Sequence, residues 1–310
     1  MQSKSSFPKL KNPTILSPMA GVTDIAFRTL AKKYGAALTC TEFVSSSGVI
    51  RGNKDTLDLL RIHPSEKPVA VQIFGGNITE VVAAGKLLEK QFDIIDFNCG
   101  CPVYKVIKNG AGSGLLKKPV FLSKLLNKLT TAVNVPVSVK IRIGVDETHI
   151  NALEIAKIAQ DAGVAAVTVH GRTQKQGYSG SADWDLIKKV KEKLSIPVFG
   201  NGDVFSPETF KNCLDESGVD GIMIGRFAIG NPYCFRQILD YLKKGSYKSI
   251  NNASLFSDYS LLAERYNLPF MSVKQQAIYF TKGLIGGSKI RSKLVKCKNI
   301  SELKVIMAIV

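Results

Sequence analysis

Between residue 14 and about residue 240, short apolar runs alternate regularly with amphipathic segments. Eight of the runs have the character of β-strands, and the segments between them have the apolar spacing and capping residues of helices. Most runs are apolar throughout, as in strands of a parallel sheet that is covered on both faces. Eight such units favour closure into a (β/α)8 TIM barrel over an open sheet. The predicted strands are residues 14–19, 37–44, 68–74, 94–97, 137–142, 165–170, 196–200 and 221–225.

The alternation stops near residue 245. A barrel of this kind takes ~250 residues, and the chain has 310. We therefore expect a barrel domain over residues 1–244 and a small helical domain over residues 245–310. The predicted helices are residues 24–34, 79–91, 119–133, 149–162, 183–194 and 206–216 in the barrel, then 255–266 and 272–284.

The charge is strongly positive and unevenly spread. The chain has a net charge of +17, and residues 241–310 hold 12 Lys and Arg against 3 Asp and Glu. Within them, residues 282–298 carry six basic residues and no acidic one. A helix with such a face contacts a phosphate backbone well, so nucleic acid is the expected partner. A solvated basic surface is the alternative.

The stretch over residues 93–102, DIIDFNCGCP, is the most informative local feature. It predicts a buried strand that ends in a loop carrying Asn98, Cys99, Gly100 and Cys101. Reactive side chains of α/β barrels sit at such strand ends, so the Cys101 thiol is a candidate proton donor or nucleophile. The alternative is a small buried hydrophobic residue, which is what most free cysteines are.

Polar side chains also lie at the C-terminal ends of the other predicted strands. In a closed barrel these ends converge on one mouth. Amides suit the edge of a heteroaromatic ring, lysine a delocalised anion, and a Gly-Arg pair a phosphate, so a bound anionic cofactor is expected. No G-x-G-x-x-G fingerprint opens a βαβ unit, so a Rossmann-type domain is not indicated. The polar residues concerned are Gln72, Asn98, Lys140, Arg142, His170, Asn201 and Arg226.

The six cysteines are scattered through a chain without a secretion signal, so we expect no disulfide framework. Cys99 and Cys101 form a C-x-C pair, but no second pair or nearby histidine completes a four-ligand site, and we expect no metal. No apolar run approaches the ~20 residues of a membrane helix. We expect a cytoplasmic protein with no membrane partner and no stable protein partner.

In combination, these motifs resemble those of the tRNA-dihydrouridine synthases, and the resemblance spans nearly the whole chain. The elements N-x-G-C-P and H-G-R-T in this order are specific, whereas either alone is weak. Two departures stand out: Cys99 occupies a position where the family often has methionine or another apolar residue, and the C-terminal segment is only loosely similar. The matching segments are residues 17–24, 72–75, 98–102, 139–142, 170–173, 182–184, 201–203 and 224–226, together with Gln176 and Tyr178.

The resemblance implies an FMN-binding barrel followed by a small helical domain that binds tRNA. It implies that Cys101 is the general acid that protonates C5 of a uracil while reduced FMN delivers hydride to C6. A thiol with an unperturbed pKa of ~8.5 is mostly protonated near neutrality and can do this. NADPH would supply the electrons, bound transiently.

The resemblance also implies roles for individual residues. Lys140 should stabilise negative charge on the reduced flavin ring. The residues implied to hold FMN are Ser17, Pro18, Met19, Gln72, Lys140, His170, Asn201, Gly202, Asp203, Gly225 and Arg226. Those implied to contact the uridine and its neighbours are Asn98, Lys105, Arg172 and Tyr178.

Two other functions remain open from the sequence. One is an FMN-dependent oxidoreductase acting on a small molecule, such as a dihydroorotate dehydrogenase, which has no use for the basic C-terminal segment. The other is a non-catalytic RNA-binding protein built on the barrel, in which Cys101 has no role. The sequence does not identify the uridine that is reduced.

Overall fold

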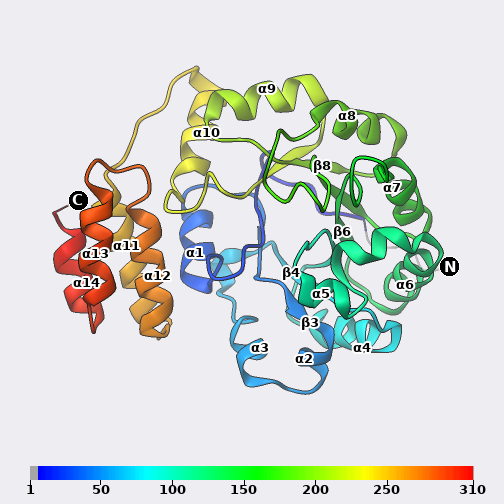
Figure 1. Ribbon diagram of the computed structural model, residues 1–310, viewed down its shortest axis with the longest axis horizontal. Helices are drawn as coiled ribbons and strands as arrows, with labels where there is room; N and C mark the ends of the chain where they lie inside the picture. The colour runs from blue at the N-terminus through cyan, green and yellow to red at the C-terminus, as the bar shows by residue number, and fades with distance from the viewer. Residues whose placement is uncertain (1–5, 310) are drawn as a thin grey trace.

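The strands form one parallel sheet that curls into a barrel (Figure 1). The structure, a computed structural model, describes residues 6–309. Within these residues the sheet order is β1-β9-β8-β7-β6-β5-β4-β2, and β3 also pairs with β4. The strands are β1 (Thr14–Leu16), β2 (Thr39–Cys40), β3 (Val44–Ser45), β4 (Val69–Phe74), β5 (Ile94–Cys99), β6 (Val137–Arg142), β7 (Ala166–His170), β8 (Val198–Asn201) and β9 (Gly221–Ile224).

The barrel closes between its first and second strands. The amide of Leu16 donates to the carbonyl oxygen of Leu38 at 2.9 Å, and the amide of Ala37 donates to that of Thr14 at 3.0 Å. These bonds join the two ends of the strand order, and the predicted (β/α)8 barrel is confirmed.

The second strand differs from the prediction, because residues 37–44 do not form one continuous strand. The chain leaves the sheet after Cys40, where the hydroxyl of Thr41 donates to the carbonyl oxygen of Glu42 at 2.8 Å. The carboxylate of Glu42 accepts the amide N–H of Gly21 at 2.7 Å. This contact with a distant loop lies within the break, and ladder pairing with β4 resumes at Val44.

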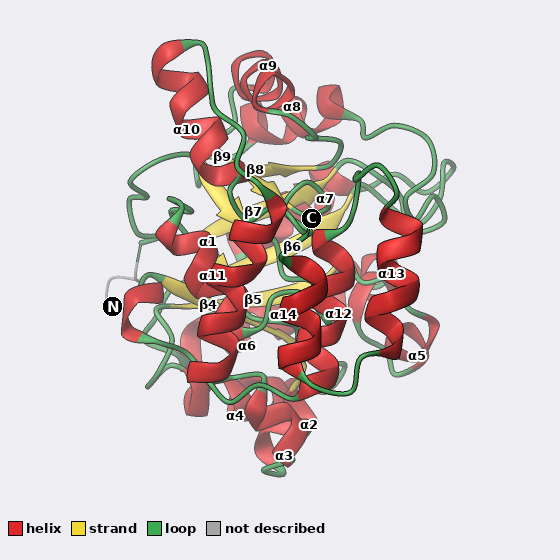
Figure 2. Ribbon diagram, turned by 90° about the vertical axis from the view of Figure 1, so that its left-hand side faces the viewer, coloured by secondary structure: helices red, strands yellow, loops and turns green. Residues whose placement is uncertain are grey.

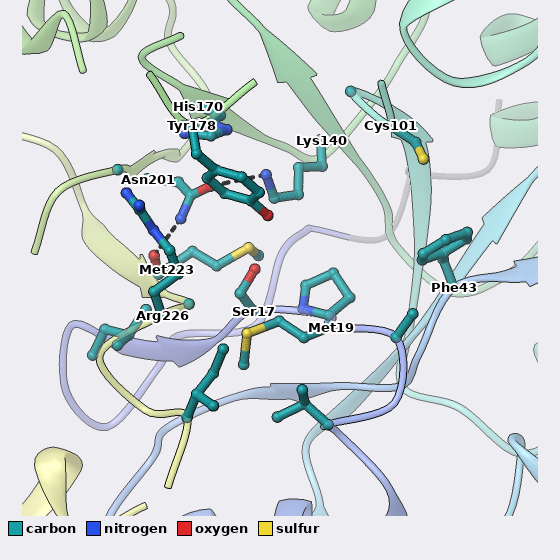
Figure 3. Close-up of a pocket in the computed structure, with 18 of the residues that line it drawn as sticks. Ser17, Met19, Phe43, Cys101, Lys140, His170, Tyr178, Asn201, Met223 and Arg226 are labelled. Carbon is teal, nitrogen blue, oxygen red and sulfur yellow. Dashed lines mark hydrogen bonds between the residues drawn. The ribbon is translucent and has the colours of Figure 1, made fainter. Parts of the chain in front are cut away.

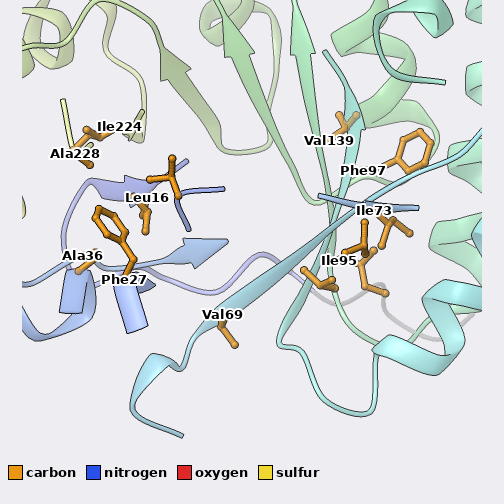
Figure 4. Packing of buried hydrophobic residues seen from close by; sticks show 14 of the residues in the cluster. Leu16, Phe27, Ala36, Val69, Ile73, Ile95, Phe97, Val139, Ile224 and Ala228 are labelled. Carbon is orange, nitrogen blue, oxygen red and sulfur yellow. The ribbon is translucent and has the colours of Figure 1, made fainter. Parts of the chain in front are cut away.

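Side chains alternate between two faces along each strand. On β6, Val137, Val139 and Ile141 pack against the surrounding helices, in the core that Figure 4 shows in part. Ser138, Lys140 and Arg142 take the other face, which points into the barrel. An apolar cluster with Ile15, Leu38, Cys40, Ala70, Ile94, Ala166, Phe199 and Met223 fills the interior below them.

Helices surround the barrel where the alternation predicts them, within a few residues at each end. The helix after the last strand, α10, was not predicted. No helix of residues 6–309 has the length and apolar composition needed to span a membrane. The surrounding helices are α1 (Ile25–Lys33), α4 (Ile78–Leu88), α6 (Pro119–Ala132), α7 (Ala152–Asp161), α8 (Trp184–Lys193), α9 (Pro207–Ser217) and α10 (Cys234–Lys244). Short elements in the loops are α2 (Ser46–Ile50), α3 (Lys54–Asp58), α5 (Tyr104–Lys108) and the 3₁₀ turns at Pro64–Glu66 and Gly112–Lys117.

Four further helices form a bundle on one side of the barrel, next to α1 (Figures 1 and 2). The two helices predicted here are confirmed, with shifted ends. The basic segment after the Gly-Gly turn also forms a helix. The four are α11 (Asn252–Arg265), α12 (Phe270–Phe280), α13 (Gly287–Lys296) and α14 (Ile300–Met307).

Candidate active site

The C-terminal ends of the strands surround a cavity of about 450 Å³ (Figure 3). This is the end at which α/β barrels carry their reactive side chains. Fourteen of the sixteen site residues predicted from the sequence line it. They are Ser17, Pro18, Met19, Gln72, Asn98, Cys101, Lys140, His170, Tyr178, Asn201, Gly202, Asp203, Gly225 and Arg226.

Lys140 is a half-buried cation in this cavity. Its Nζ donates a hydrogen bond to Oδ1 of Asn201 at 2.9 Å, and Nδ2 of Asn201 donates to the carbonyl oxygen of Met223 at 2.7 Å. Burial, together with repulsion from Arg142, lowers the pKa of Lys140 to about 8. The hydrogen bond to Asn201 therefore fixes the direction of the ammonium group, but its positive charge is poorly compensated. This favours an anionic ligand beside it.

His170 lies at the end of β7 on the same face. Burial lowers its pKa to about 2, and the positive charges of Lys140, Arg142 and Arg172 act in the same direction. The imidazole is neutral at physiological pH. It therefore offers one hydrogen-bond donor and one acceptor to a ligand but no charge.

The Cys101 thiol stands on a loop that several hydrogen bonds fix. Oδ1 of Asn98 accepts the amide N–H groups of Gly100 at 3.0 Å and of Cys101 at 2.9 Å. The carbonyl oxygen of Cys101 accepts from the hydroxyl of Ser113 at 2.8 Å. Gly112 has a φ of +58°, and a Cβ there would lie 2.8 Å from that carbonyl oxygen, so glycine is required. Burial raises the pKa of the thiol, which keeps it protonated near neutrality.

The two thiols of the C-x-C pair have different surroundings. Cys99 is fully buried in the core between the strands and the helices, next to other outward-facing side chains of β5. Cys101 lines the cavity. Cys101 is therefore the thiol of this pair that a ligand in the cavity would meet. Within residues 6–309, no group of three or more His, Cys, Asp and Glu side chains is arranged to hold a metal ion.

Asp203 organises the loops after β7, β8 and β9. Its Oδ1 lies 2.8 Å from Nη1 of Arg172 and 2.9 Å from Nη2 of Arg226. Its Oδ2 accepts the amide N–H of Ala182 at 2.7 Å. Burial acts to raise the pKa of Asp203, but these hydrogen bonds and the two arginines hold it below its usual value. The carboxylate is ionised and its charge is already paired.

Arg226 is placed by aromatic rings as well as by Asp203. Its guanidinium carbon lies 4.8 Å from the ring centre of Tyr178 and 5.0 Å from that of Phe205. Such contacts hold a guanidinium in one plane. The cation is thus positioned at the cavity rim, beside the loops that follow β8 and β9.

The chain's similarity to known proteins decides its family. A family model described as dihydrouridine synthase (Dus) matches residues 15–283. The chain belongs to the dihydrouridine synthase family. The resemblance expected from the motifs is confirmed.

Curated members of the family cover most of the chain. The tRNA-dihydrouridine synthase B of Pseudomonas putida is 45% identical over 240 residues, which are 77% of this chain and 71% of the relative. A probable tRNA-dihydrouridine synthase of Rickettsia conorii is 42% identical over 260 residues, which are 83% of this chain and 78% of the relative.

Solved structures share the barrel at low sequence identity. A histamine dehydrogenase from Rhizobium sp. 4-9 aligns with 82% of this chain and 49% of its own, at a TM-score of 0.58 and 14% identity. An old yellow enzyme homologue from Zymomonas mobilis aligns with 78% of this chain and 91% of its own, at a TM-score of 0.55 and 14% identity. At this level of identity the likeness supports the fold alone.

Two predicted site residues lie outside the cavity wall. Lys105 is exposed on α5, in the segment that follows the thiol loop. Arg172 is buried, and its guanidinium donates to the carbonyl oxygen of Ser179 at 3.0 Å as well as to Asp203. Their contacts with the substrate stay predictions.

Arg142, predicted from its place at a strand end to reach the barrel mouth, lines the cavity without having been given a specific role. Several other lining residues were not predicted, among them Phe43, for which the sequence offered only its aromatic character. It offered no signal for Tyr279, which reaches the cavity from α12 of the helical bundle. The additional lining residues include Ala20, Phe43, Arg142, Phe205, Met223 and Tyr279.

Proposed function

We propose that this protein reduces the C5–C6 double bond of a uridine in tRNA to 5,6-dihydrouridine, with Cys101 as the proton donor. The family match and the curated relatives confirm the predicted enzyme class, a flavin-dependent oxidoreductase of the tRNA-dihydrouridine synthase type. The observation that carries the proposed mechanism is that the protonated Cys101 thiol and the half-buried Lys140 ammonium line one cavity.

The proposed cofactor is FMN, and the chemistry of the cavity fits it. The ammonium of Lys140 and the amides of Gln72 and Asn201 suit the polar edge of an isoalloxazine ring. Arg226 and the loop at Gly202 suit a phosphate at the ends of β8 and β9. Gly225 lines the cavity, and a Cβ there would be in ordinary van der Waals contact with Sδ of Met19 and Cβ of Ser17, both at 3.8 Å. The remaining proposed FMN contacts are Ser17, Pro18, Met19, His170 and Asp203.

Three residues of the cavity have a defined part in the proposed reaction: Cys101, Lys140 and His170. When bound, FMN supplies the hydride that C6 of the uracil receives. The Cys101 thiol gives its proton to C5, and its raised pKa keeps that proton in place until the base arrives. The ammonium group of Lys140 would stabilise negative charge on the reduced cofactor. His170 is neutral, so it can form a hydrogen bond to the cofactor without adding charge to the cavity. NADPH is the proposed electron source, in a transient complex.

The proposed substrate is tRNA, and the charge distribution supports this. We assign residues 1–244 as the catalytic barrel and residues 245–310 as a tRNA-binding domain. The basic segment over residues 282–298 begins next to the cavity, since Nζ of Lys282 lies 3.4 Å from the carbonyl oxygen of Arg226 and Tyr279 lines the cavity itself. Phosphates bound along α13 would therefore leave a flipped-out uridine within reach of the mouth.

A second exposed segment borders the thiol loop. The side chains of Val103 and Tyr104 are 50% and 76% exposed directly after Pro102, and they are followed by Lys105 and Lys108. Aromatic groups next to lysines are typical of surfaces on which unpaired bases stack. We assign this segment to the nucleotides beside the target uridine, with Asn98, Tyr178 and Arg172 as the other substrate-side candidates.

Mass spectrometry of unmodified tRNA tests the proposal directly. The tRNA is incubated with the purified protein, FMN and NADPH, digested, and examined for a gain of two hydrogens at one uridine. We expect that gain with the wild type and its loss with Cys101→Ala. Binding of tRNA without reduction would favour the non-catalytic alternative, and turnover of free dihydroorotate would favour the small-molecule one.

A further inference from the structure

Asp96 is a buried carboxylate beneath the cavity. It lies on the inward face of β5, two residues before Asn98, and its residue is 3% exposed. It is not one of the residues that line the cavity. Its Oδ2 accepts from Nε2 of Gln72 at 2.6 Å, and its Oδ1 accepts from the hydroxyl of Ser138 at 2.6 Å. Asp96 therefore joins β4, β5 and β6 inside the barrel.

A chain of hydrogen bonds runs from Asp96 to the thiol loop. Oε1 of Gln72 accepts from Nδ2 of Asn98 at 2.7 Å. Oδ1 of Asn98 then accepts the amide N–H groups of Gly100 and Cys101. We call this series of contacts, Asp96–Gln72–Asn98–Cys101, the amide relay.

The chemistry of the two ends determines the orientation of both amides. Burial raises the pKa of Asp96, whereas the hydrogen bonds from Gln72 and Ser138 act to lower it. Both bonds end on carboxyl oxygens of Asp96, so the NH₂ group of Gln72 faces Asp96. The oxygen of Gln72 then faces Asn98, whose NH₂ group has to point towards it. At the other end, the backbone N–H groups of Gly100 and Cys101 only donate, and they require the oxygen of Asn98. Both ends demand the same arrangement, and flipping either amide leaves buried polar groups unpaired.

We propose that Asp96 is a positioning residue that fixes the thiol loop through this relay. The proposal rests on the proposed function for the role of Cys101, whereas the relay concerns how the loop is held. In this arrangement Asp96 never touches the substrate. It determines which way Gln72 and Asn98 present their amides, and through Asn98 it holds the backbone that carries the thiol.

The reactivity of Cys101 in the protein without tRNA tests the proposal. The rate of alkylation by iodoacetamide at pH 8 is measured on the Cys101 peptide by mass spectrometry, together with amide hydrogen exchange over residues 98–105. Asp96→Leu keeps the branch at Cγ and the number of side-chain heavy atoms but removes the acceptor. We expect Cys101 alkylation about tenfold faster, because the buried hydrogen bond that orients Gln72 is lost from the relay.

Two variants separate the relay from other roles of Asp96. Asp96→Asn keeps an oxygen that can face Gln72 but removes the charge, and we expect Cys101 alkylation within about threefold of wild type. Ser138→Ala removes the other hydrogen bond to Asp96, outside the relay, and we expect the same small effect. If either variant matched Asp96→Leu, a charge effect or a general packing effect would replace the proposal.

Other cysteines of the same molecule report on global unfolding. Cys99 and Cys234 are fully buried in the core. If the effect is local, only the alkylation of Cys101 becomes faster. An equal increase in the alkylation rates of all three thiols would overturn the proposal. Should Asp96→Leu fail to fold, Gln72→Leu breaks the relay at its second member, and unchanged Cys101 reactivity in that variant overturns it as well. These readouts need no tRNA reduction, so failure of the proposed function would be seen separately.

Discussion

The hydroxyl of Tyr259 donates a hydrogen bond of 2.9 Å to Oδ2 of Asp24, across the contact between the helical bundle and the barrel. Asp24 also caps α1, because its Oδ1 accepts the amide N–H of Phe27 at 2.9 Å. Nearby, Nε2 of Gln276 donates to the carbonyl oxygen of Val22 at 2.6 Å. The segment from residue 17 to residue 24, part of which lines the cavity, is thus tied directly to α11 and α12.

Tyr259→Phe removes the hydroxyl from this contact. Since the Asp24 carboxyl is buried and loses a donor, we expect the free energy of unfolding to fall by about 2 kcal/mol. Urea denaturation measures the loss. Tyr266→Phe is a matched control, because its hydroxyl lies 3.3 Å from the uncharged Oγ1 of Thr29. Equal losses of stability in the two variants would show that the buried carboxyl of Asp24 does not make the Tyr259 hydrogen bond more important than the Tyr266 one.

Replacing the two cysteines of the C-x-C pair is expected to have different effects, on activity for Cys101 and on stability for Cys99. Cys101→Ala should lower the single-turnover rate of uridine reduction by about 10²–10⁴-fold, the usual contribution of a general acid, while tRNA binding is kept. Cys99→Ala should keep the activity and lose about 1 kcal/mol of stability, because it opens a small void in the core. Loss of activity in Cys99→Ala with an intact fold would reverse the assignment.

Lys140 is expected to make the stability of the flavin-free protein depend on pH. Its pKa is about 8 in the folded protein and returns to 10.5 on unfolding. The folded-state value lies below the unfolded one, so the charged group costs stability below pH 8, and this cost disappears between pH 8 and 10.5. The free energy of unfolding of the wild type should therefore rise relative to that of Lys140→Met over this window. A constant difference between the two proteins would show that Lys140 titrates normally.

The ion pair between Arg28 and Glu66 is the buried contact with the largest predicted effect on stability. Nε of Arg28 lies 2.7 Å from Oε2 of Glu66, and the two side chains are 1% and 0% exposed. Glu66→Gln leaves the guanidinium without its counter-charge and should cost about 3–5 kcal/mol. Asp161→Asn breaks the exposed pair with Lys157 and should cost less than about 1 kcal/mol. Thermal and urea denaturation compare the two.

Tyr104 tests the proposed tRNA surface beside the thiol. Because stacking on a base contributes about 1–3 kcal/mol, Tyr104→Ala should raise the KM for tRNA about tenfold. Tyr104→Phe keeps the ring and should keep the wild-type KM. The flavin absorption spectrum should be the same in both variants. An unchanged KM in Tyr104→Ala would remove this residue from the tRNA surface.

Local patterns in the sequence determined the order of strands and helices. The predicted strand over residues 137–142 is β6 itself, and its alternation already places Lys140 and Arg142 on one face. Parallel strands share one direction, so polar residues at their C-terminal ends had to meet at one mouth. The seven polar residues predicted from their places at strand ends all line the cavity, whereas the other predicted site residues came from the family resemblance. The seven are Gln72, Asn98, Lys140, Arg142, His170, Asn201 and Arg226.

Only the tertiary structure decided what depends on contacts between distant parts of the chain. The amide of Gly21 bonds to Glu42 within the break of the second strand, Arg172 pairs with Asp203 outside the cavity wall, and the docking of α12 brings Tyr279 into the cavity. The hydrogen-bonded path from Asp96 to Cys101 passes through Gln72, on the neighbouring strand. Each of these contacts joins residues on different elements, and local sequence preferences carry no information about such pairings.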